Sequence, residues 1–384
     1  MHGLIPLSVV TKGLECGGTE RHLLHILPRL AATHYDVCLH PLQSEGTLAD
    51  SFLERGVRVV GVHGPRGRLC RLMSLASSIR RRRPLVHCFL PEAYLLGANL
   101  GRLLGANSVI MSRRSRNHYQ LRHPFASSVE RRMHRNVDAL IGNSRAVVQD
   151  LLDEGAPPER VQLIYNGIDV DRFAVDSLRL NRRELVRSQL GLPFERIVLI
   201  CIANLFTYKG HADLLDALRV LGPAMTERIS LLLVGRDAGT ASRLKEQASR
   251  FGLSAIVRFL GERDDVADLL AASDIGVLAS HEEGFSNAVL EGMAASLPMV
   301  VTDVGGNAEA VIDGECGYVV PAHTPAALAH ALGNLIGDAD RRQAMGAAAR
   351  RRVAACFSLD ACVAAYQALY EELWERRSHA SHRP

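Results

Sequence analysis

The sequence has few of the features that mark disulfide-rich, zinc-binding and membrane-spanning proteins. Its eight cysteines are scattered and include no Cys-x-x-Cys pair, so we expect small core residues in a reducing compartment. No apolar run approaches the ~20 residues that a membrane-spanning helix needs. The N-terminal Met1-His2-Gly3 lacks the basic start and long apolar core of a signal peptide. These absences predict a cytoplasmic protein.

Aromatic residues are also scarce, at 5% of the chain, whereas 47% of the residues are hydrophobic. A core built mainly from Leu, Val and Ala is typical of α/β domains. At 384 residues the chain is too long for one ordinary domain, so two are expected.

The net charge of +4 is unequally divided along the chain. Residues 1–175 hold 23 Lys and Arg against 15 Asp and Glu, a net charge of +8, and the remainder has a net charge of −4. The basic first half predicts an anionic partner, such as a phospholipid surface or a phosphorylated acceptor. Nucleic acid is not expected, because no aromatic residues alternate with the basic clusters and no nucleic-acid-binding motif is present.

Two arginine-rich stretches, at 80–83 and 131–135, contribute to this charge. Either could lie on an anionic membrane leaflet, where each charge contributes about 1 kcal/mol. The alternative is a solvated helix end, since cations favour helix C-termini.

Strand-like apolar runs alternate with amphipathic helical segments along the whole chain, which predicts parallel α/β sheets. We expect a first domain at 1–170, a linker region at 171–195, a second domain at 196–356, and a C-terminal helix and tail at 357–384, with the helix at 359–377. The predicted strands lie at 5–10, 37–42, 57–62, 85–89, 108–111, 139–142, 161–165, 197–203, 229–234, 256–260, 275–279, 299–302 and 318–320.

Two carboxylates, Glu283 and Glu291, flank a short segment between a predicted strand and a predicted helix at 287–296. This places Glu283 in a loop above a strand end and Glu291 on the helix. The backbone amides between them lie at a helix N-terminus, where the dipole and unpaired donors favour a phosphate. Carboxylates accept hydrogen bonds from hydroxyls, so this layout is that expected for a nucleotide sugar.

The Glu-x7-Glu spacing with Gly284-Phe285 after the first acid resembles the signature of retaining glycosyltransferases of family 4, also called group 1, which have the GT-B fold. Further segments resemble this family in the same order, so the similarity spans nearly the whole chain. They are Gly17-Gly18-Thr19-Glu20-Arg21, the stretch from Leu163 to Asp169, the stretch from Pro298 to Gly306, and the stretch from Asp313 to Val320. The resemblance implies two facing Rossmann-like domains, with a C-terminal helix that crosses back to the first.

The resemblance also implies roles for the residues around the two acids. Glu291 is expected to bind the ribose hydroxyls of the donor, and Glu283 to approach the transferred sugar. Main-chain amides of Phe285, Ser286 and Asn287 are expected to hold sugar or phosphate oxygens. The reaction implied is glycosyl transfer with retention, to a glycan or lipid-linked acceptor of cell-envelope or exopolysaccharide synthesis.

Lys209 follows a predicted strand and begins a helix, a position from which it can neutralise a diphosphate and stabilise the departing group. The resembled family usually has an arginine a few residues before this lysine, and here Asn204 stands near that place. Arg263 or Arg236 could supply the second cation. We therefore assign Lys209 and Glu283 catalytic roles, and include Asn204 and Arg263 among the donor-binding residues.

In the first domain, Gly17-Gly18 precedes an amphipathic helix. Paired glycines allow the backbone to approach an anion closely, although the same pair also occurs in a plain turn. In the resembled fold this loop faces the donor.

The candidate acceptor residues lie at the ends of first-domain strands. Arg113 and Arg114 could bind an acceptor phosphate bidentately or belong to a solvated basic loop. Many members of the resembled family have a histidine near this point, and His118 could replace it. His87 ends another strand and is expected more as a core or cleft-wall histidine than as a catalyst.

Asp169-Val170-Asp171 imitates the metal-binding motif of another glycosyltransferase fold, but it follows a predicted interdomain turn, so we expect neither metal nor another cofactor.

Two other functions stay open. One is a nucleotide-sugar-binding protein that has lost catalysis, given the unusual Asn204. The other is an NAD-dependent oxidoreductase, against which the absence of Gly-x-Gly-x-x-Gly after the first strand counts.

Overall fold

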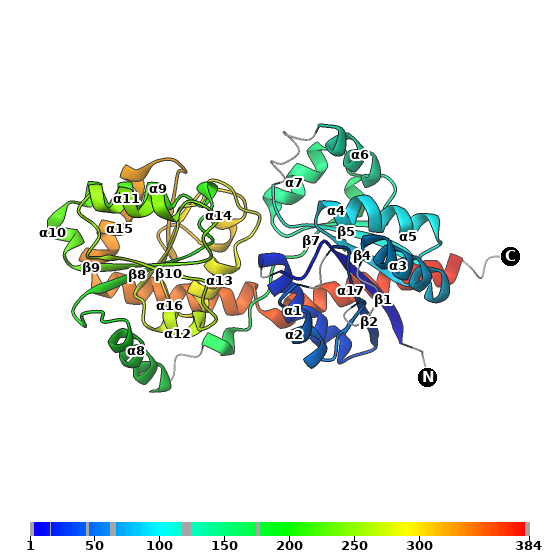
Figure 1. The fold of residues 1–384 in the computed structure, drawn as a ribbon, viewed down its shortest axis with the longest axis horizontal. Helices are drawn as coiled ribbons and strands as arrows, with labels where there is room; N and C mark the ends of the chain where they lie inside the picture. The colour runs from blue at the N-terminus through cyan, green and yellow to red at the C-terminus, as the bar shows by residue number, and fades with distance from the viewer. Residues whose placement is uncertain are drawn as a thin grey trace. The chain divides into compact units, whose positions relative to one another are not determined.

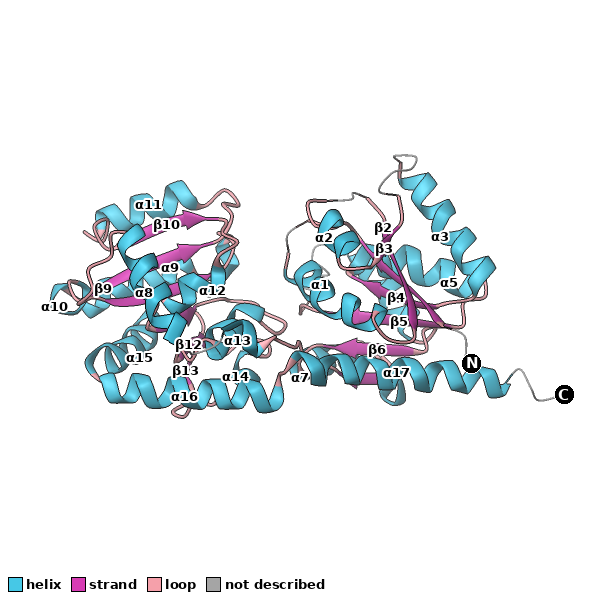
Figure 2. Ribbon diagram, turned by 90° about the horizontal axis from the view of Figure 1, so that it is seen from below, coloured by secondary structure: helices cyan, strands magenta, loops and turns pink. Residues whose placement is uncertain are grey.

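The computed structural model describes residues 4–15, 17–43, 46–61, 67–116, 124–173 and 177–380, which form two compact α/β units. The first unit contains the chain up to Gly167 and again from Leu359, and the second contains Ile168–Ser358. In both units helices cover the faces of a central sheet (Figures 1 and 2).

The first unit is built on a seven-stranded sheet with the order β3-β2-β1-β4-β5-β6-β7, in which all pairs are parallel. Its strands are β1 Ile5–Thr11, β2 Tyr35–Pro41, β3 Arg58–Val59, β4 Leu85–Phe89, β5 Ser108–Arg113, β6 Ala139–Gly142 and β7 Val161–Leu163. Its helices are α1 Gly18–Ala31, α2 Ala49–Glu54, α3 Arg68–Arg82, α4 Pro91–Ala93, α5 Asn99–Leu103, α6 Pro124–His134, α7 Arg145–Asp153 and α17 Leu359–Ala380.

Alternating side chains of β4 show how this sheet fills two cores. Leu85 and Phe89 belong to a cluster with α1, α2 and α17, whereas Val86 and Cys88 belong to a cluster with α3 and the π-helical turn Tyr94–Ala98. This division follows from the two-residue period of a strand. Because both faces are covered, the strands are mainly apolar, as parallel strands usually are.

The C-terminal helix α17 packs against α1, although more than 300 residues separate them in sequence (Figure 1). Tyr366, Tyr370 and Leu373 of α17 are buried in the first core. The chain therefore leaves the first unit after Gly167 and returns to it at Leu359. The C-terminal helix thus belongs to the first unit, as the resemblance implied.

The second unit has a six-stranded parallel sheet with the order β10-β9-β8-β11-β12-β13. Its strands are β8 Ile197–Ile202, β9 Ile229–Val234, β10 Val257–Gly261, β11 Ile275–Leu278, β12 Met299–Thr302 and β13 Gly317–Val320. Its helices are α8 Ser177–Gln189, α9 His211–Leu221, α10 Pro223–Thr226, α11 Ala241–Arg250, α12 Val266–Ala271, α13 Asn287–Ala294, α14 Asn307–Ala310, α15 Pro325–Gly337 and α16 Ala339–Cys356.

Every predicted strand is present, and the bounds of β4, β6, β9 and β12 are those predicted. The largest difference is β3, predicted over 57–62 but paired only at Arg58 and Val59. Gly61 has a φ of +93°, a conformation that ends the extended run.

The region 171–195 differs from the linker that was expected. It carries α8, which packs against α12 within the second unit. Arg187 is buried there, donates to the carbonyl of Ala272 at 2.9 Å and pairs with Asp274 at 2.6 Å. Because the buried arginine Arg187 helps to anchor the helix, its polar sequence resembled a linker.

Candidate functional site

The second sheet has the strand order 3-2-1-4-5-6 within its unit, so the connections reverse direction between β8 and β11. Ligands of open α/β sheets bind outside the carboxyl ends of the strands at such a point. Lys209 follows β8 and Glu283 follows β11, and both loops leave the sheet at this edge. The fold thus brings together the two residues that the sequence assigned to catalysis.

Lys209 and Glu283 form an ion pair, with Nζ of the lysine 2.6 Å from Oε1 of the acid. The hydroxyl of Ser280 donates to the same oxygen at 2.7 Å. The side chains of Lys209 and Glu283 are only 18% and 9% exposed. Burial by itself lowers the pKa of Lys209, but attraction to Glu283 outweighs it and raises this pKa above the ordinary value. The lysine is therefore held as a cation.

Backbone contacts join the two loops. Gly210 has a φ of +67°, and a Cβ placed on it would lie 1.8 Å from the carbonyl oxygen of Ala279. The amide of His281 donates to the carbonyl of Tyr208 at 2.7 Å. Only glycine permits this approach, so Gly210 fixes the distance between the lysine loop and the acid loop.

The glycine pair after β12 holds the acid loop from its other side. Gly305 has a φ of +54°, and a Cβ on it would lie 2.1 Å from the carbonyl oxygen of Glu283. The amide of Gly306 donates to the carbonyl of Gly284 at 2.7 Å. These glycines, which formed part of the family resemblance, therefore position the backbone of Glu283.

Helix α13 follows this loop with Ser286 as its N-cap, and the side chain of Ser286 makes no capping hydrogen bond. Phe285 is buried and packs against Phe357 at a ring distance of 5.2 Å. Asn287 begins the helix, and Glu291 lies half-buried just over one turn along it. The helix thus presents its N-terminal end beside Glu283, where its dipole favours an anion.

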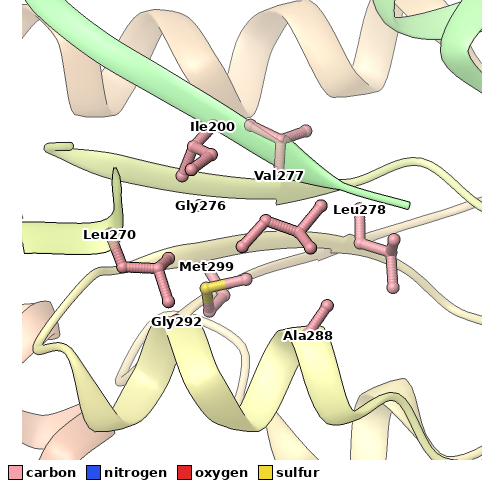
Figure 3. Close-up of a pocket in the computed structure, with 9 residues that line it drawn as sticks. Ile200, Leu270, Gly276, Val277, Leu278, Ala288, Gly292 and Met299 are labelled. Atoms are coloured by element: carbon pink, nitrogen blue, oxygen red, sulfur yellow. The ribbon is translucent and has the colours of Figure 1, made fainter. Parts of the chain in front are cut away.

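Close packing beneath α13 sets its position on the sheet (Figure 3). The sulfur of Met299 lies in the space left by two glycines, Gly276 of β11 and Gly292 of α13. A Cβ on these glycines would lie 2.3 and 2.5 Å from that sulfur. The same residues line a small apolar cavity that has no polar or charged side chain in its lining.

The two further donor-site candidates are tied to neighbouring groups. Oδ1 of Asn204 accepts from the amide of Arg236 at 3.0 Å, so this asparagine links the ends of β8 and β9. Arg263 lies just after β10, and its guanidinium bonds both oxygens of Asp265 at 2.8 and 2.6 Å. That partner raises the pKa of Arg263.

In the first unit, Gly17 caps α1, which begins at Gly18, at the carboxyl end of β1. Arg114 follows β5 and donates to Oδ1 of Asn166 at 2.8 Å. Burial lowers the pKa of Arg114, and burial raises the pKa of the nearby Glu20, whose charge is attracted to that arginine. These residues form a polar, largely desolvated edge on the first sheet.

Two of the acceptor candidates, Arg113 and His87, have buried side chains, as the core or cleft-wall alternative for His87 expected. Arg113 is 2% exposed and paired with Glu130 at 2.7 Å and with Glu154 at 2.7 Å. His87 is fully buried between Tyr370 and Ser112, each at 2.7 Å. Burial lowers the pKa of His87 to about 3, so it stays neutral in the core. His118, the third candidate, lies outside the described residues.

The basic stretch 131–135 spans the end of α6 and the residue after it. Arg131, Arg132 and Arg135 are exposed, whereas Met133 and His134 are buried. Phe125, near the start of the same helix, is 83% exposed. No helix in the described part of the chain has the length and apolar character needed to cross a membrane.

Sequence reasoning missed several polar groups at the carboxyl edge of the second sheet. Ser280 and His281 precede Glu283 by three and two positions, and Asp213 lies on α9. Nε2 of His281 donates to Oδ2 of Asp213 at 2.9 Å. The signal available was their position after β11 and at the start of a helix, the places where ligand-binding side chains gather.

Two family models match most of the chain. The model described as "Glycosyl transferases group 1" matches residues 182–352. The model described as "Glycosyltransferase Family 4" matches residues 16–172.

Curated relatives include a "D-inositol 3-phosphate glycosyltransferase" of Corynebacterium jeikeium, 36% identical over 246 residues, which cover 62% of this chain and 58% of the relative. A protein of the same name from Geodermatophilus obscurus is 33% identical over 250 residues, covering 62% of this chain and 54% of the relative. The chain thus spans little more than half the length of these curated relatives.

Solved structures share the whole architecture. Anabaena HepE in complex with UDP superposes with a TM-score of 0.85, at 20% identity, over 96% of this chain and 100% of that one. WaaG, described as a glycosyltransferase involved in lipopolysaccharide biosynthesis, has a TM-score of 0.73 at 21% identity, over 94% and 98% of the two chains. At these identities the likeness shows the fold, which is the predicted GT-B arrangement.

Proposed function

Because the chain belongs to the group 1 glycosyltransferases, we propose that it transfers a sugar from a nucleotide-sugar donor to a glycan or lipid-linked acceptor, with retention of the anomeric configuration. The observation that carries this proposal is the Lys209–Glu283 pair at the reversal point of the second sheet. A cation, a carboxylate and a helix N-terminus meet there, which is the set of groups that a sugar diphosphate requires.

In the proposed complex the diphosphate lies between Lys209 and the N-terminal end of α13, within reach of the backbone of Phe285, Ser286 and Asn287. Glu291 accepts from the ribose hydroxyls, and Glu283 accepts from the transferred sugar. Asn204 and Arg263 complete the donor site at the neighbouring strand ends. Complexes of HepE with UDP and with UDP-glucose support a nucleotide sugar as donor.

Loss of the leaving group builds negative charge on the diphosphate, so a cation that is already in place lowers the barrier. Lys209 meets this need because its pairing with Glu283 keeps it charged. When the diphosphate binds, Lys209 neutralises it as well as Glu283. The carboxylate of Glu283 can then accept hydrogen bonds from the sugar hydroxyls. No protein nucleophile and no metal ion is required by this scheme.

We assign the acceptor to the first unit, near Arg114 at the carboxyl edge of its sheet, and keep Gly17 and Gly18 as donor-binding residues. The net charge of +8 over residues 1–175 favours an anionic acceptor. The names of the curated relatives add inositol phosphate to the glycan and lipid-linked candidates.

A cytoplasmic enzyme that binds the inner face of the membrane, in envelope or exopolysaccharide synthesis, fits this charge. Exposed arginines are screened over about 8 Å at physiological ionic strength, so purely electrostatic binding must weaken with salt. The chain should sediment with anionic but not zwitterionic vesicles, and replacement of Arg131, Arg132 and Arg135 by Ser should release it. The matched control replaces the exposed Arg228, Arg243 and Arg250 of the second unit. Equal sedimentation with both vesicle types would remove the membrane from the proposal.

The test of the function itself begins with a thermal-shift screen of UDP-, GDP- and ADP-sugars. The stabilising donor is then incubated with membrane lipid extract, polysaccharide fragments or inositol phosphate, and product is followed by mass spectrometry. The anomeric coupling constant in the NMR spectrum of the product reports retention or inversion. No stabilisation by any of the nucleotide sugars would contradict the proposal.

The second candidate function is a nucleotide-sugar-binding protein without catalysis, favoured by Asn204 where the family usually has an arginine. Such a protein would be stabilised by a donor but would not turn it over with any acceptor. Release of nucleoside diphosphate separates the two functions.

A further inference from the structure

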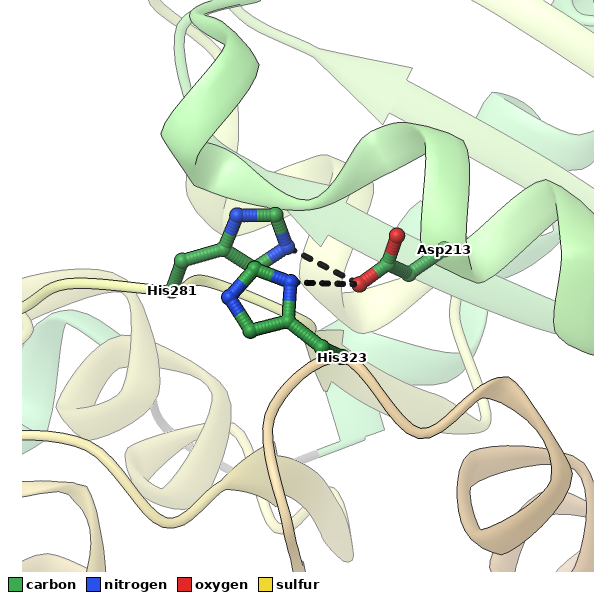
Figure 4. A group of neighbouring side chains, drawn as sticks. All are labelled: Asp213, His281 and His323. Carbon is green, nitrogen blue, oxygen red and sulfur yellow. Dashed lines mark hydrogen bonds and ion pairs between the residues drawn. The ribbon is translucent and has the colours of Figure 1, made fainter.

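Three metal-ligating side chains meet at the carboxyl edge of the second sheet, beside the donor site but not part of it (Figure 4). Asp213 comes from the first turn of α9, His281 from the loop after β11, and His323 from the loop between β13 and α15. Their ligand atoms all lie within 4.8 Å of one another. Each residue comes from a different segment, so the cluster is a product of the fold.

The two imidazoles point toward one oxygen of the same carboxylate (Figure 4). Oδ2 of Asp213 lies 2.9 Å from Nε2 of His281 and 3.9 Å from Nδ1 of His323. In a tetrahedral zinc site, with bonds of about 2.0–2.2 Å, neighbouring ligand atoms are about 3.3 Å apart. These two distances lie on either side of that value, and the two imidazole nitrogens lie within 4.8 Å of each other, so side-chain movements would give three corners of a tetrahedron.

The ligand types select the class of ion. Two imidazole nitrogens and one carboxylate oxygen suit Zn²⁺ and neighbouring transition metals, whereas Mg²⁺ and Ca²⁺ prefer oxygen ligands. Three protein ligands leave the fourth position to water or another small ligand.

The cluster is open to solvent from one side. The His323 side chain is 67% exposed, whereas those of Asp213 and His281 are about one-fifth exposed. Two ligands are therefore held by the protein, and the third can move to close on an ion.

We propose that Asp213, His281 and His323 bind one divalent transition-metal ion, which ties α9 to the loops after β11 and β13. His281 lies two residues before Glu283, and its amide already bonds the carbonyl beside Lys209. A bound ion would thus stabilise the loop that carries Glu283 without touching the Lys209–Glu283 pair. The existence of this site does not rest on the proposed function.

The test uses the full chain without a histidine tag, stripped of metal with EDTA and then dialysed free of chelator. Titration with Zn²⁺ in a calorimeter should give one saturable site per chain, and Co²⁺ should give a visible absorption spectrum of tetrahedral type. Zn²⁺ should also raise the melting temperature, because an ion that binds only the folded state stabilises it.

Two variants locate the site. His323→Ala and Asp213→Asn should each weaken Zn²⁺ binding by on the order of tenfold or more, and abolish the Co²⁺ spectrum. His330→Ala, which removes an exposed histidine of α15, is the matched control and should bind like the parent. The proposal is overturned if the parent shows no saturable Zn²⁺ binding, or if His323→Ala binds Zn²⁺ as the parent does.

Discussion

The amino group of Lys209 lies 2.6 Å from Oε1 of Glu283, although the two residues are 74 positions apart. They meet because β8 and β11 are neighbours in the sheet and both end at the same edge. The pair is mostly buried, so each side chain compensates the charge of the other in the absence of a donor.

Lys209→Ala should abolish sugar transfer and weaken binding of the donor, because it removes the cation that we propose neutralises the leaving diphosphate. It should also cost about 1–3 kcal/mol of stability, since Glu283 would lose its cationic partner and keep the hydrogen bond from the hydroxyl of Ser280. Transfer is measured as nucleoside diphosphate release, and stability by thermal unfolding.

Two further variants separate chemistry from folding. The double variant Lys209→Met with Glu283→Gln removes both charges, and should regain stability but not transfer. Lys245→Ala removes an exposed lysine of the same unit and should behave like the parent. Parental transfer rates in Lys209→Ala would exclude the lysine from the reaction.

Gly305→Ala tests whether the glycine pair after β12 positions the acid loop. The new Cβ would approach the carbonyl of Glu283 to 2.1 Å, so the loop must move. Gly252→Ala is the matched control, because Gly252 has a similar φ of +71° but nothing near its Cβ position. Both variants carry backbone strain of about 1–3 kcal/mol, and only Gly305→Ala should also lose transfer. Equal transfer by the two variants would show that the contact has no effect on the site.

The positions of the main donor-site residues could be predicted from the sequence, because hydrophobic patterns show where strands end. Lys209, Glu283 and the start of α13 were each placed after a strand, and parallel topology then brings them to one edge. The position of a strand end does not show which of its side chains form ion pairs or hydrogen bonds with residues far away in the sequence. Arg113 is neutralised by Glu130 and Glu154, 17 and 41 positions away, and His87 is hydrogen-bonded to Tyr370, 283 positions away.

The stability of the first unit should fall in acid because of buried histidines. His40 is 2% exposed, and burial lowers its pKa to about 3. Below about pH 6.5 the unfolded chain binds a proton at this residue that the folded chain does not. The stabilisation from a neutral His40 is therefore full above about pH 6.5 and is lost as the pH falls toward 3.

His40→Leu should remove this dependence, leaving a pH slope smaller by up to about 1.4 kcal/mol per pH unit. The single tryptophan, Trp374 on α17, packs against the first core, so its fluorescence follows that unit alone during urea unfolding. Parallel pH profiles for the parent and His40→Leu would show that His40 is protonated in the folded state as readily as in the unfolded state.

Sugar transfer should continue in EDTA if, as we propose, Lys209 and a helix N-terminus supply the positive charge for the diphosphate. Removal of an ion from Asp213, His281 and His323 should lower the melting temperature without stopping the reaction. Transfer and melting are measured on the same EDTA-treated sample. Complete loss of transfer, restored by Mn²⁺ or Mg²⁺, would contradict metal independence and direct attention to Asp169 and Asp171.

The central claim is that the carboxyl edge of the second sheet holds the donor nucleotide, and isothermal titration with the nucleoside diphosphate tests it most directly. Glu291→Ala removes the proposed charged acceptor to a ribose hydroxyl and should weaken binding by about 1.5–3 kcal/mol, roughly ten- to a hundredfold. Glu246→Ala, an exposed acid of α11, should leave binding unchanged. If Glu291→Ala and Lys209→Ala both bind the nucleotide as tightly as the parent, the donor does not lie at this edge.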